Sequence, residues 1–139
     1  MALTPYFIDS SYILALLNTR DQWHPKALEL QRRIEISDQT LITTEFVFAE
    51  IADGLSTVRF REVGAAAIRS LITNEKVVII PATSELFEKA LSLYESRPDK
   101  TWGFTDCTSF VVMTENGITD ALTTDDDFRQ AGFNPLMLQ

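Results

Sequence analysis

The sequence predicts an α/β fold in which helices cover both faces of a parallel sheet. Two observations support this fold class. Short runs rich in β-branched and aromatic residues alternate along the chain with longer runs whose apolar residues recur at helical spacing. The run VVII at 77–80 is apolar without interruption, which is typical of a parallel strand covered on both faces. Because strands that alternate with helices are joined by crossover connections, we expect a three-layer α/β/α arrangement.

The first half of the chain begins with an apolar run that ends in an acid. A strand is expected at 5–9, and a helix at 10–18 follows it directly. Ser10 or Ser11 is available to cap that helix. Pro25 is compatible with the first turn of the next helix, where no hydrogen bond from its nitrogen is needed. The remaining elements expected in this half are the helix over 27–34, the strand 41–43 and the helix 44–55.

The second half continues the alternation and carries clear start and stop signals. Pro81 ends a strand, and Ser84 precedes an amphipathic run as a helix start. Gly117 ends a helix that begins at Thr105 or its neighbour and runs through Asn116. The elements expected here are, in order, the helix 61–73, the strand 77–80, the helix 84–96, the helix 105–116, the strand 118–123, a short helix after Asp125 and a last strand at 136–138.

The size and composition of the chain favour one globular domain. Of its 139 residues, 45% are hydrophobic and 23% are charged, so we expect a single domain over residues 1–139. Cys107 is the only cysteine, which excludes an internal disulfide and fits a reducing compartment. No run approaches the roughly 20 apolar residues that span a bilayer, and no leader segment is visible. We therefore expect a cytoplasmic protein without a membrane partner.

The charge of the chain argues against nucleic-acid binding through a broad basic surface. The formal net charge is −8 and the isoelectric point is near 4.5, whereas such binding needs many lysine and arginine contacts to phosphate. Any RNA or DNA substrate would need local positive charge from a metal ion, a partner chain or a few basic side chains. The basic residues considered for this role, each of which is more simply a solvated surface residue, are Arg59, Arg61, Arg69 and Lys100.

Several acidic residues stand within or against elements that are expected to be buried. Asp9 and Asp125 each follow a strand, so both lie at the edge of the sheet where ligands of such folds bind. Glu50 is the only charge in the run FVFAEIA, and on a helix it lies between the directions of Phe46 and Val47. Each has an ordinary alternative. Asp9 could cap a helix, and Glu50 could reach solvent at the margin of the apolar stripe.

Two further acids belong to the same set. Asp106 opens a helix and shares a helical face with Phe110, although an acid in the first turn also suits the helix dipole. The turn TTDDDF holds three aspartates, and Thr124 and Asp127 could form a capping box there. We favour Asp125 as a metal ligand and expect an outer or alternating role for Asp127.

A shared metal site explains these acids together, whereas the ordinary explanations are independent of one another. Carboxylates that converge without a cation repel one another and raise their own pKa values. Oxygen ligands without a nearby histidine or cysteine indicate Mg²⁺ or Mn²⁺ rather than zinc. The sequence therefore indicates a metal site formed by Asp9, Glu50, Asp106 and Asp125, with Asp127 close by.

With these residues in place, the chain resembles the PIN-domain nucleases, and within them the VapC-like toxins (virulence-associated protein C type) of type II toxin–antitoxin systems. The segments that carry the resemblance are FIDSSYILALL, TTEFVFAEIADGL and WGFTDCTSFVVMTENGITDALTTDDDF, and the last is the most specific. The resemblance implies a PIN-like sheet of four or five parallel strands and a divalent-cation-dependent endoribonuclease acting on RNA. It also implies a homodimer and a small cognate antitoxin whose tail enters the groove.

The resemblance also assigns roles to individual residues. It implies that the metal-site acids are Asp9, Glu50, Asp106 and Asp125, that Asp127 is a frequent additional aspartate, and that Thr105 and Thr123 orient neighbouring carboxylates. With such a site, a metal-activated water would attack the phosphorus atom and leave a 5′-phosphate and a 3′-hydroxyl.

Two other functions are compatible with parts of the pattern. A receiver-like signalling domain has a similar length and an acidic Mg²⁺ pocket, but it needs an acceptor aspartate after its central strand and a late lysine. Here Pro81 follows VVII, and no lysine follows Lys100. A catalytically silent PIN-fold module could instead hold a basic peptide in the acidic groove. The intact set of acids favours catalysis over this alternative.

Overall fold

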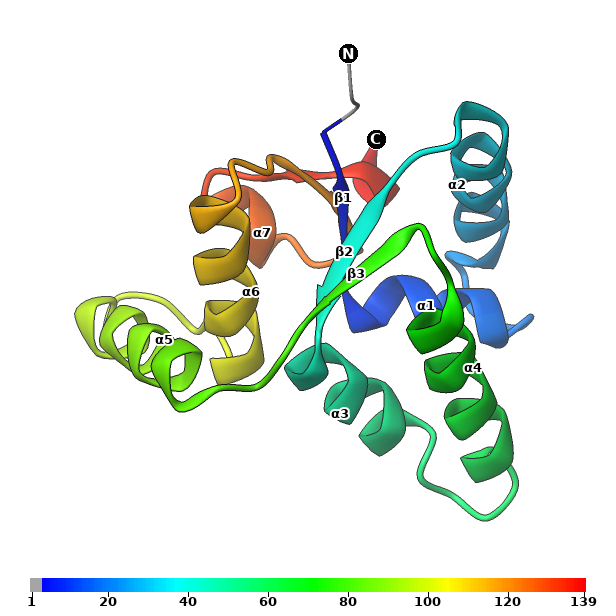
Figure 1. The fold of residues 1–139 in the computed structure, drawn as a ribbon, viewed down its shortest axis with the longest axis horizontal. Helices are drawn as coiled ribbons and strands as arrows, with labels where there is room; N and C mark the ends of the chain where they lie inside the picture. Colours follow the sequence, from blue (N-terminus) through cyan, green and yellow to red (C-terminus); the bar gives the residue numbers. More distant parts are fainter. Residues whose placement is uncertain (1–3) are drawn as a thin grey trace.

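The computed structural model describes residues 4–139, and its central element is a parallel sheet (Figure 1). The strands lie in the order β3-β2-β1-β4-β5, and every neighbouring pair is parallel. The strands are β1 (Tyr6–Ile8), β2 (Leu41–Thr44), β3 (Val77–Ile80), β4 (Asp120–Leu122) and β5 (Asn134–Pro135). This sheet confirms the α/β fold class and the larger of the two expected strand numbers.

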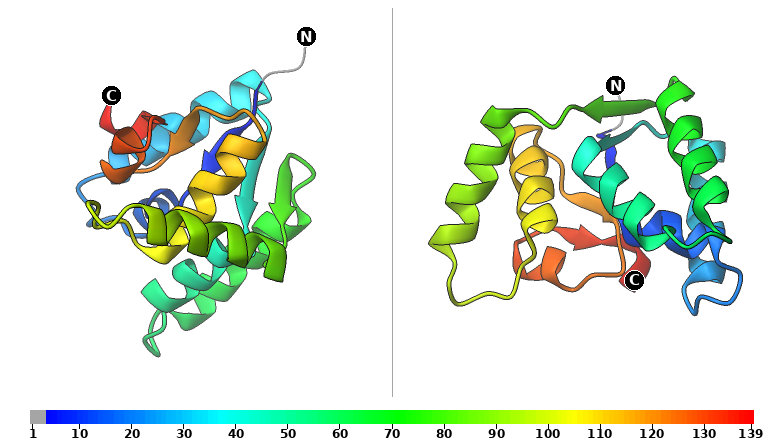
Figure 2. Two further views of the ribbon diagram at one scale, coloured as in Figure 1. Left: turned by 90° about the vertical axis from the view of Figure 1, so that its left-hand side faces the viewer. Right: turned by 90° about the horizontal axis from the view of Figure 1, so that it is seen from below.

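Helices lie on two sides of the sheet, as expected for a three-layer fold. Figure 1 shows α5 and α6 on one side and α1, α2 and α4 on the other, and the view from below in Figure 2 keeps this separation. The helices are α1 (Ser10–Leu17), α2 (His24–Ser37), α3 (Glu45–Gly54), α4 (Arg61–Thr73), α5 (Ser84–Ser96), α6 (Phe104–Glu115), α7 (Asp127–Gln130) and the 3-10 helix η1 (Leu136–Leu138). None of them, within residues 4–139, is both long and apolar enough to cross a bilayer.

Local chemistry explains where several of these helices begin and end. The hydroxyl of Thr44 accepts a hydrogen bond from the backbone N–H of Val47 at 3.1 Å, and Thr83 accepts one from Leu86 at 3.1 Å. Both contacts satisfy a donor that the first turn of a helix leaves free. Gly117 follows α6 with a φ of 64°, a conformation that costs glycine little, and this turns the chain toward β4.

The core holds the acidic turn after β4 against the middle of the sheet. Phe128 is fully buried, and its ring centroid lies 6.5 Å from that of Phe7 in β1 and 5.0 Å from that of Phe110 in α6. In β1, Phe7 pairs with Ala121, and Ile8 pairs with Leu122 in β4. The residues that follow these strands therefore emerge side by side, which places Asp9 next to Thr123.

Two expectations about strands are wrong in detail. The run 77–80 is not covered on both faces, because β3 pairs only with β2 at the edge of the sheet and Val78 is 53% exposed. An apolar run indicates a strand but does not reveal which strands will flank it. The last strand lies at Asn134–Pro135 rather than 136–138, and the residues that follow it form η1.

Two expectations about helix caps are also wrong. Asp9 occupies the N-cap position of α1 without a capping hydrogen bond from its side chain, and neither Ser10 nor Ser11 supplies one, because both lie within the helix. Thr83 rather than Ser84 caps α5. The two serines are used in the acidic site instead.

Candidate metal centre

Asp9 is a buried carboxylate with one satisfied and one unsatisfied oxygen. It follows β1 at the centre of the sheet and is 3% exposed. Its Oδ2 accepts hydrogen bonds from the hydroxyls of Thr123 at 2.7 Å and Ser11 at 2.9 Å. Its Oδ1 is buried and has no hydrogen-bond partner among the described residues. A buried carboxylate oxygen without a donor needs a positively charged partner, and a metal ion meets this need.

The turn after β4 is shaped by hydrogen bonds that begin at Thr123. The hydroxyl of Thr123 accepts the backbone N–H of Asp125 at 3.0 Å, and Asp125 Oδ1 accepts the backbone N–H of Asp127 at 2.8 Å. The backbone N–H of Thr124 donates to Ser11 Oγ at 3.0 Å. Asp125 therefore satisfies the N–H of Asp127, the role for which Thr124 was considered in a capping box. The turn is thereby fixed to the start of α1.

Three carboxylates converge above this turn. Asp106, in the first turn of α6, offers an oxygen that lies within 4.8 Å of oxygens from Asp125 and Asp127, and all three side chains are partly buried. Asp127 contributes one of these three oxygens, and its outer or alternating role toward a metal stays a prediction. Asp9 and Glu50 lie outside the group of three. Such a cluster offers oxygen ligands of the kind that hard divalent cations prefer.

Glu50 approaches the site from α3, which follows β2. Its Oε1 accepts a hydrogen bond from the hydroxyl of Ser10, which fixes the glutamate against the start of α1. The charge of Glu50 contributes to raising the pKa of both Asp9 and Asp106, so it lies close enough to act on both. The inward direction expected for Glu50 thus agrees with the structure.

Burial and mutual repulsion raise the pKa values of the carboxyl groups in this site. Burial, followed by the charges of Asp9, Asp125, Glu50 and Asp127, raises the pKa of Asp106 to about 8. Burial is the main cause that raises the pKa of Asp9 to about 6, against the lowering effect of its hydroxyl donors. Burial and the charge of Asp125 also raise the pKa of Asp127. A divalent cation would relieve this repulsion by favouring the charged forms.

The residues present fit a divalent cation. Three partly buried carboxylates converge, and a fourth presents an oxygen that accepts no hydrogen bond. Among the described residues, neither a histidine nor a cysteine belongs to the cluster of three. An acidic cluster of this kind can bind a metal ion. The four acids predicted from the sequence lie in four separate segments, and the fold brings them together beyond the carboxyl ends of β1 and β4.

The serines at the start of α1 are the residues that sequence reasoning missed. Ser10 holds Glu50, and Ser11 connects Asp9 to the turn after β4. The signal was the pair of hydroxyls directly after a buried acid, which we interpreted as helix caps. Thr123 donates a hydrogen bond to Asp9, a contact that the orienting role implied by the resemblance requires. Thr105 does not act in the same way, since its hydroxyl forms no hydrogen bond to a carboxylate within residues 4–139.

Comparison with known proteins gives matches over nearly the whole chain. The family model described as the PIN domain matches residues 6–134. VapC20 of Mycobacterium tuberculosis, named a 23S rRNA-specific endonuclease, is 30% identical over 127 residues in strains CDC 1551 / Oshkosh and H37Rv. The alignment covers 91% of this chain and 94% of VapC20.

Two solved structures are similar in fold. The crystal structure of M. tuberculosis VapC20, described as a Sarcin-Ricin loop cleaving toxin, matches with a TM-score of 0.80 and 28% identity, over 93% of this chain and 96% of that one. VapBC2 from Rickettsia felis, bound to a DNA fragment from its promoter, matches with a TM-score of 0.62 and 16% identity, over 90% and 91%, and this likeness concerns the fold alone. On the strength of the family model and the identity to VapC20, the chain belongs to the PIN-domain family, in its VapC-like branch.

Proposed function

We propose that this chain is a metal-dependent endoribonuclease, the toxin of a type II toxin–antitoxin pair, that hydrolyses phosphodiester bonds in RNA. The observation that carries the proposal is the convergence of Asp106, Asp125 and Asp127 beside the unsatisfied oxygen of Asp9. The 30% identity to a 23S rRNA-specific endonuclease supports the reaction class. A receiver-like function has no comparable support.

The acids divide into ligands and a water-orienting group. Asp9, Asp106 and Asp125 are the principal ligands of Mg²⁺ or Mn²⁺ in this proposal. Asp127, whose carboxylate converges with those of Asp106 and Asp125, joins them in an outer or alternating role. Glu50 is a ligand or the base that orients the attacking water. Ser10 keeps its carboxylate in one place, which favours a fixed water position.

The chemistry follows from the distribution of charge. A divalent cation held by Asp9, Asp106 and Asp125 would offset the repulsion between the carboxylates and the scissile phosphate, lower the pKa of water and stabilise developing negative charge. The protein holds the carboxylates in position through Thr123 and Ser11, so little reorganisation is needed when RNA enters. The products we propose are a 5′-phosphate and a 3′-hydroxyl.

The substrate we propose is ribosomal RNA, with the sarcin–ricin loop of 23S rRNA as the first candidate. The support for this target is the function named for VapC20. The similarity between the two proteins extends over 91% of this chain. Structured loops of this kind present unstacked bases that a protein can read by shape and stacking. The same rRNA loop offers a defined cleavage test.

The test is an end-mapping experiment with the purified protein. Total rRNA is incubated with the wild type in Mg²⁺, in Mn²⁺ and in EDTA, and the new RNA ends are sequenced. Asp9→Ala serves as the inactive variant, and Asp53→Asn, on the exposed end of α3, is the matched control for a lost acid. We expect cation-dependent cuts from the wild type and Asp53→Asn, and none from Asp9→Ala.

Metal binding has a readout that does not depend on cleavage. Isothermal titration calorimetry with Mn²⁺ and Mg²⁺ measures the affinity and the stoichiometry of the site. Asp106→Asn and Asp125→Asn should weaken binding, whereas Asp53→Asn should not. A wild type that binds the cations but cuts no RNA would favour the catalytically silent PIN-fold module.

We also propose two protein partners, a small cognate antitoxin and a second copy of this chain. Both rest on the VapC-like membership of the chain. Light scattering of the purified protein measures the dimer, and co-expression with the product of the adjacent gene, followed by co-purification, tests for the antitoxin. A monomer at all concentrations would refute the homodimer, and failure to co-purify would count against the antitoxin.

A further inference from the structure

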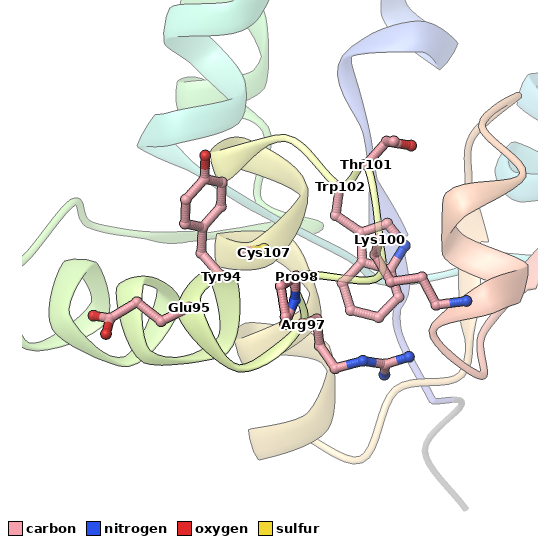
Figure 3. Close-up of a pocket in the computed structure, with 8 residues that line it drawn as sticks. All are labelled: Tyr94, Glu95, Arg97, Pro98, Lys100, Thr101, Trp102 and Cys107. Atoms are coloured by element: carbon pink, nitrogen blue, oxygen red, sulfur yellow. The ribbon is translucent and has the colours of Figure 1, made fainter.

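A pocket of about 440 Å³ lies between the end of α5 and the start of α6 (Figure 3). Tyr94, Arg97, Lys100 and Trp102 are among its lining residues, and we call it the Trp102 pocket. Its volume falls in the range of pockets that hold small molecules. The function proposed above uses none of these residues.

The pocket and the acidic cluster share the segment that leads into α6. Lys100 and Trp102 line the pocket, and Asp106 lies in the first turn of α6. Trp102 directly precedes Gly103, and a side-chain carbon added at Gly103 would lie 3.8 Å from Oδ2 of Asp106. A strand of RNA with one phosphate at the acidic cluster would therefore have its neighbouring nucleotide near the pocket.

Two basic side chains of the pocket lie against one aromatic ring. The guanidinium carbon of Arg97 lies 5.0 Å from the Trp102 ring centroid, and the ammonium nitrogen of Lys100 lies 5.9 Å from it. Figure 3 shows both side chains extending to the same side of the Trp102 ring, with Tyr94 on the other side. In a chain with a net charge of −8, Lys100 offers local positive charge for an RNA strand beside the acidic cluster, whereas the charge of Arg97 is offset by Asp99.

Arg97 and Lys100 differ in which of their groups remain free to contact RNA. Arg97 donates from Nε and Nη2 to the two carboxylate oxygens of Asp99, each at 3.0 Å, so its planar group is held in one orientation beside Trp102 while its side chain remains 39% exposed. Lys100 forms no ion pair with any acid in residues 4–139, within the 4.0 Å that defines one. Lys100 is thus free to bind a phosphate, and Arg97 offers a flat surface on which a base can stack.

We propose that the Trp102 pocket binds one nucleotide of the RNA next to the bond that is cut, with its phosphate on Lys100 and its base on the plane of Arg97. Tyr94, which is 52% exposed, borders the same pocket and adds a second aromatic surface. This inference rests on the proposed ribonuclease function and names a recognition subsite for it.

The other basic residues considered from the sequence do not share this position. Arg61 and Arg69 line a separate, mainly apolar pocket between α3 and α4. Arg59 lies over the ring of its neighbour Phe60 at 5.2 Å in the loop before α4. Of the four candidates, Lys100 is the one that lines the Trp102 pocket, in the segment that leads to Asp106.

The first test measures RNA binding without cleavage. Fluorescence anisotropy in EDTA, over a series of salt concentrations, gives the dissociation constant for a labelled single-stranded RNA and for a stem-loop with the sarcin–ricin sequence. Lys100→Gln should weaken binding about tenfold, because a charge-assisted contact is lost. It should also reduce the slope of log Kd against log salt concentration by about 0.7, the value for one phosphate contact in a single strand.

Arg97→Lys separates stacking from charge. This change keeps the positive charge and removes the planar surface, so we expect binding to weaken about tenfold with an unchanged salt slope. Matched controls on α2, across the sheet in Figure 1, are Lys26→Gln and Arg33→Lys. Both controls should bind as the wild type does. A wild type that binds neither RNA, or pocket variants that bind like the controls, would overturn the inference.

The second test uses NMR to detect whether RNA binds at Trp102. The chain has two tryptophans, so its NMR spectrum holds two indole N–H signals, one from Trp102 and one from Trp23 in the loop between α1 and α2. Titration with the same RNA should shift the Trp102 signal and leave that of Trp23 in place. A shift of neither signal would contradict the proposal. RNA binding at Trp102 without cleavage in Mg²⁺ would refute the proposed enzymatic function and leave the subsite intact.

Discussion

Replacement of Asp106 by asparagine is expected to stabilise the metal-free protein at pH values near 8. Burial and four neighbouring carboxylates raise the pKa of Asp106 to about 8, whereas an aspartate in an unfolded chain titrates near 4. Below about pH 4 the group is protonated in both states and the fold carries no penalty. As the pH rises from about 4 to about 8, the unfolded chain loses its proton first, so the folded state loses stability progressively.

The size of the effect follows from the difference in pKa. At about 1.4 kcal/mol for each unit, a difference of about four units gives roughly 6 kcal/mol as the upper bound. Asp106 is only partly buried, and screening by solvent reduces the expected gain from asparagine to about 2 kcal/mol. The gain should disappear at about pH 4, where aspartic acid and asparagine carry the same charge.

Urea unfolding in EDTA, followed by circular dichroism at a series of pH values, measures this gain. We expect the wild-type free energy of unfolding to decrease toward pH 8 and that of Asp106→Asn to decrease less. Asp53→Asn, at an exposed site in α3, is the matched control and should follow the wild type. If Asp106→Asn were less stable than the wild type at pH 8 in EDTA, the repulsive acidic cluster would be refuted.

Three further substitutions test how the site is supported. Ser10→Ala removes the donor to Glu50, and we expect kcat for RNA cleavage to fall about tenfold with an unchanged melting temperature, measured by single-turnover kinetics and calorimetry. Thr123→Val keeps the side-chain shape but removes a donor to Asp9, and the free energy of unfolding in urea should fall by about 1–3 kcal/mol. Phe128→Ala empties a fully buried position behind the acidic turn and should lower that free energy by about 3–5 kcal/mol, with weaker Mn²⁺ binding in calorimetry.

The alternation of elements was predictable from the sequence because it depends on local patterns. The helix at 61–73 and the strand at 77–80 have the predicted boundaries in the structure. The order of the strands depends instead on pairing between distant segments, which no local pattern encodes. This is why VVII, apolar throughout, was expected to be covered on both faces although it forms the edge strand β3.

The acids of the site were predictable for a different reason. Asp9, Glu50 and Asp106 conflict with their apolar surroundings, and a residue that breaks a local rule often serves a function. The convergence of Asp127 with Asp106 and Asp125 was not predictable, because the turn that brings them together depends on the hydrogen bond between the backbone N–H of Asp127 and Asp125. The role of Ser11 depends on the pairing of β1 with β4, so it too emerges only in three dimensions.

The contact between Thr123 and Asp9 joins residues that are 114 positions apart in the chain. A chain synthesised only through β3 contains Asp9 and Glu50 but neither Asp106 nor the turn after β4. Under the proposed function, RNA cleavage needs both parts of the site, so it has to await the synthesis of β4 and its pairing with β1. The order of translation would thus keep the growing chain inactive until its acids can meet.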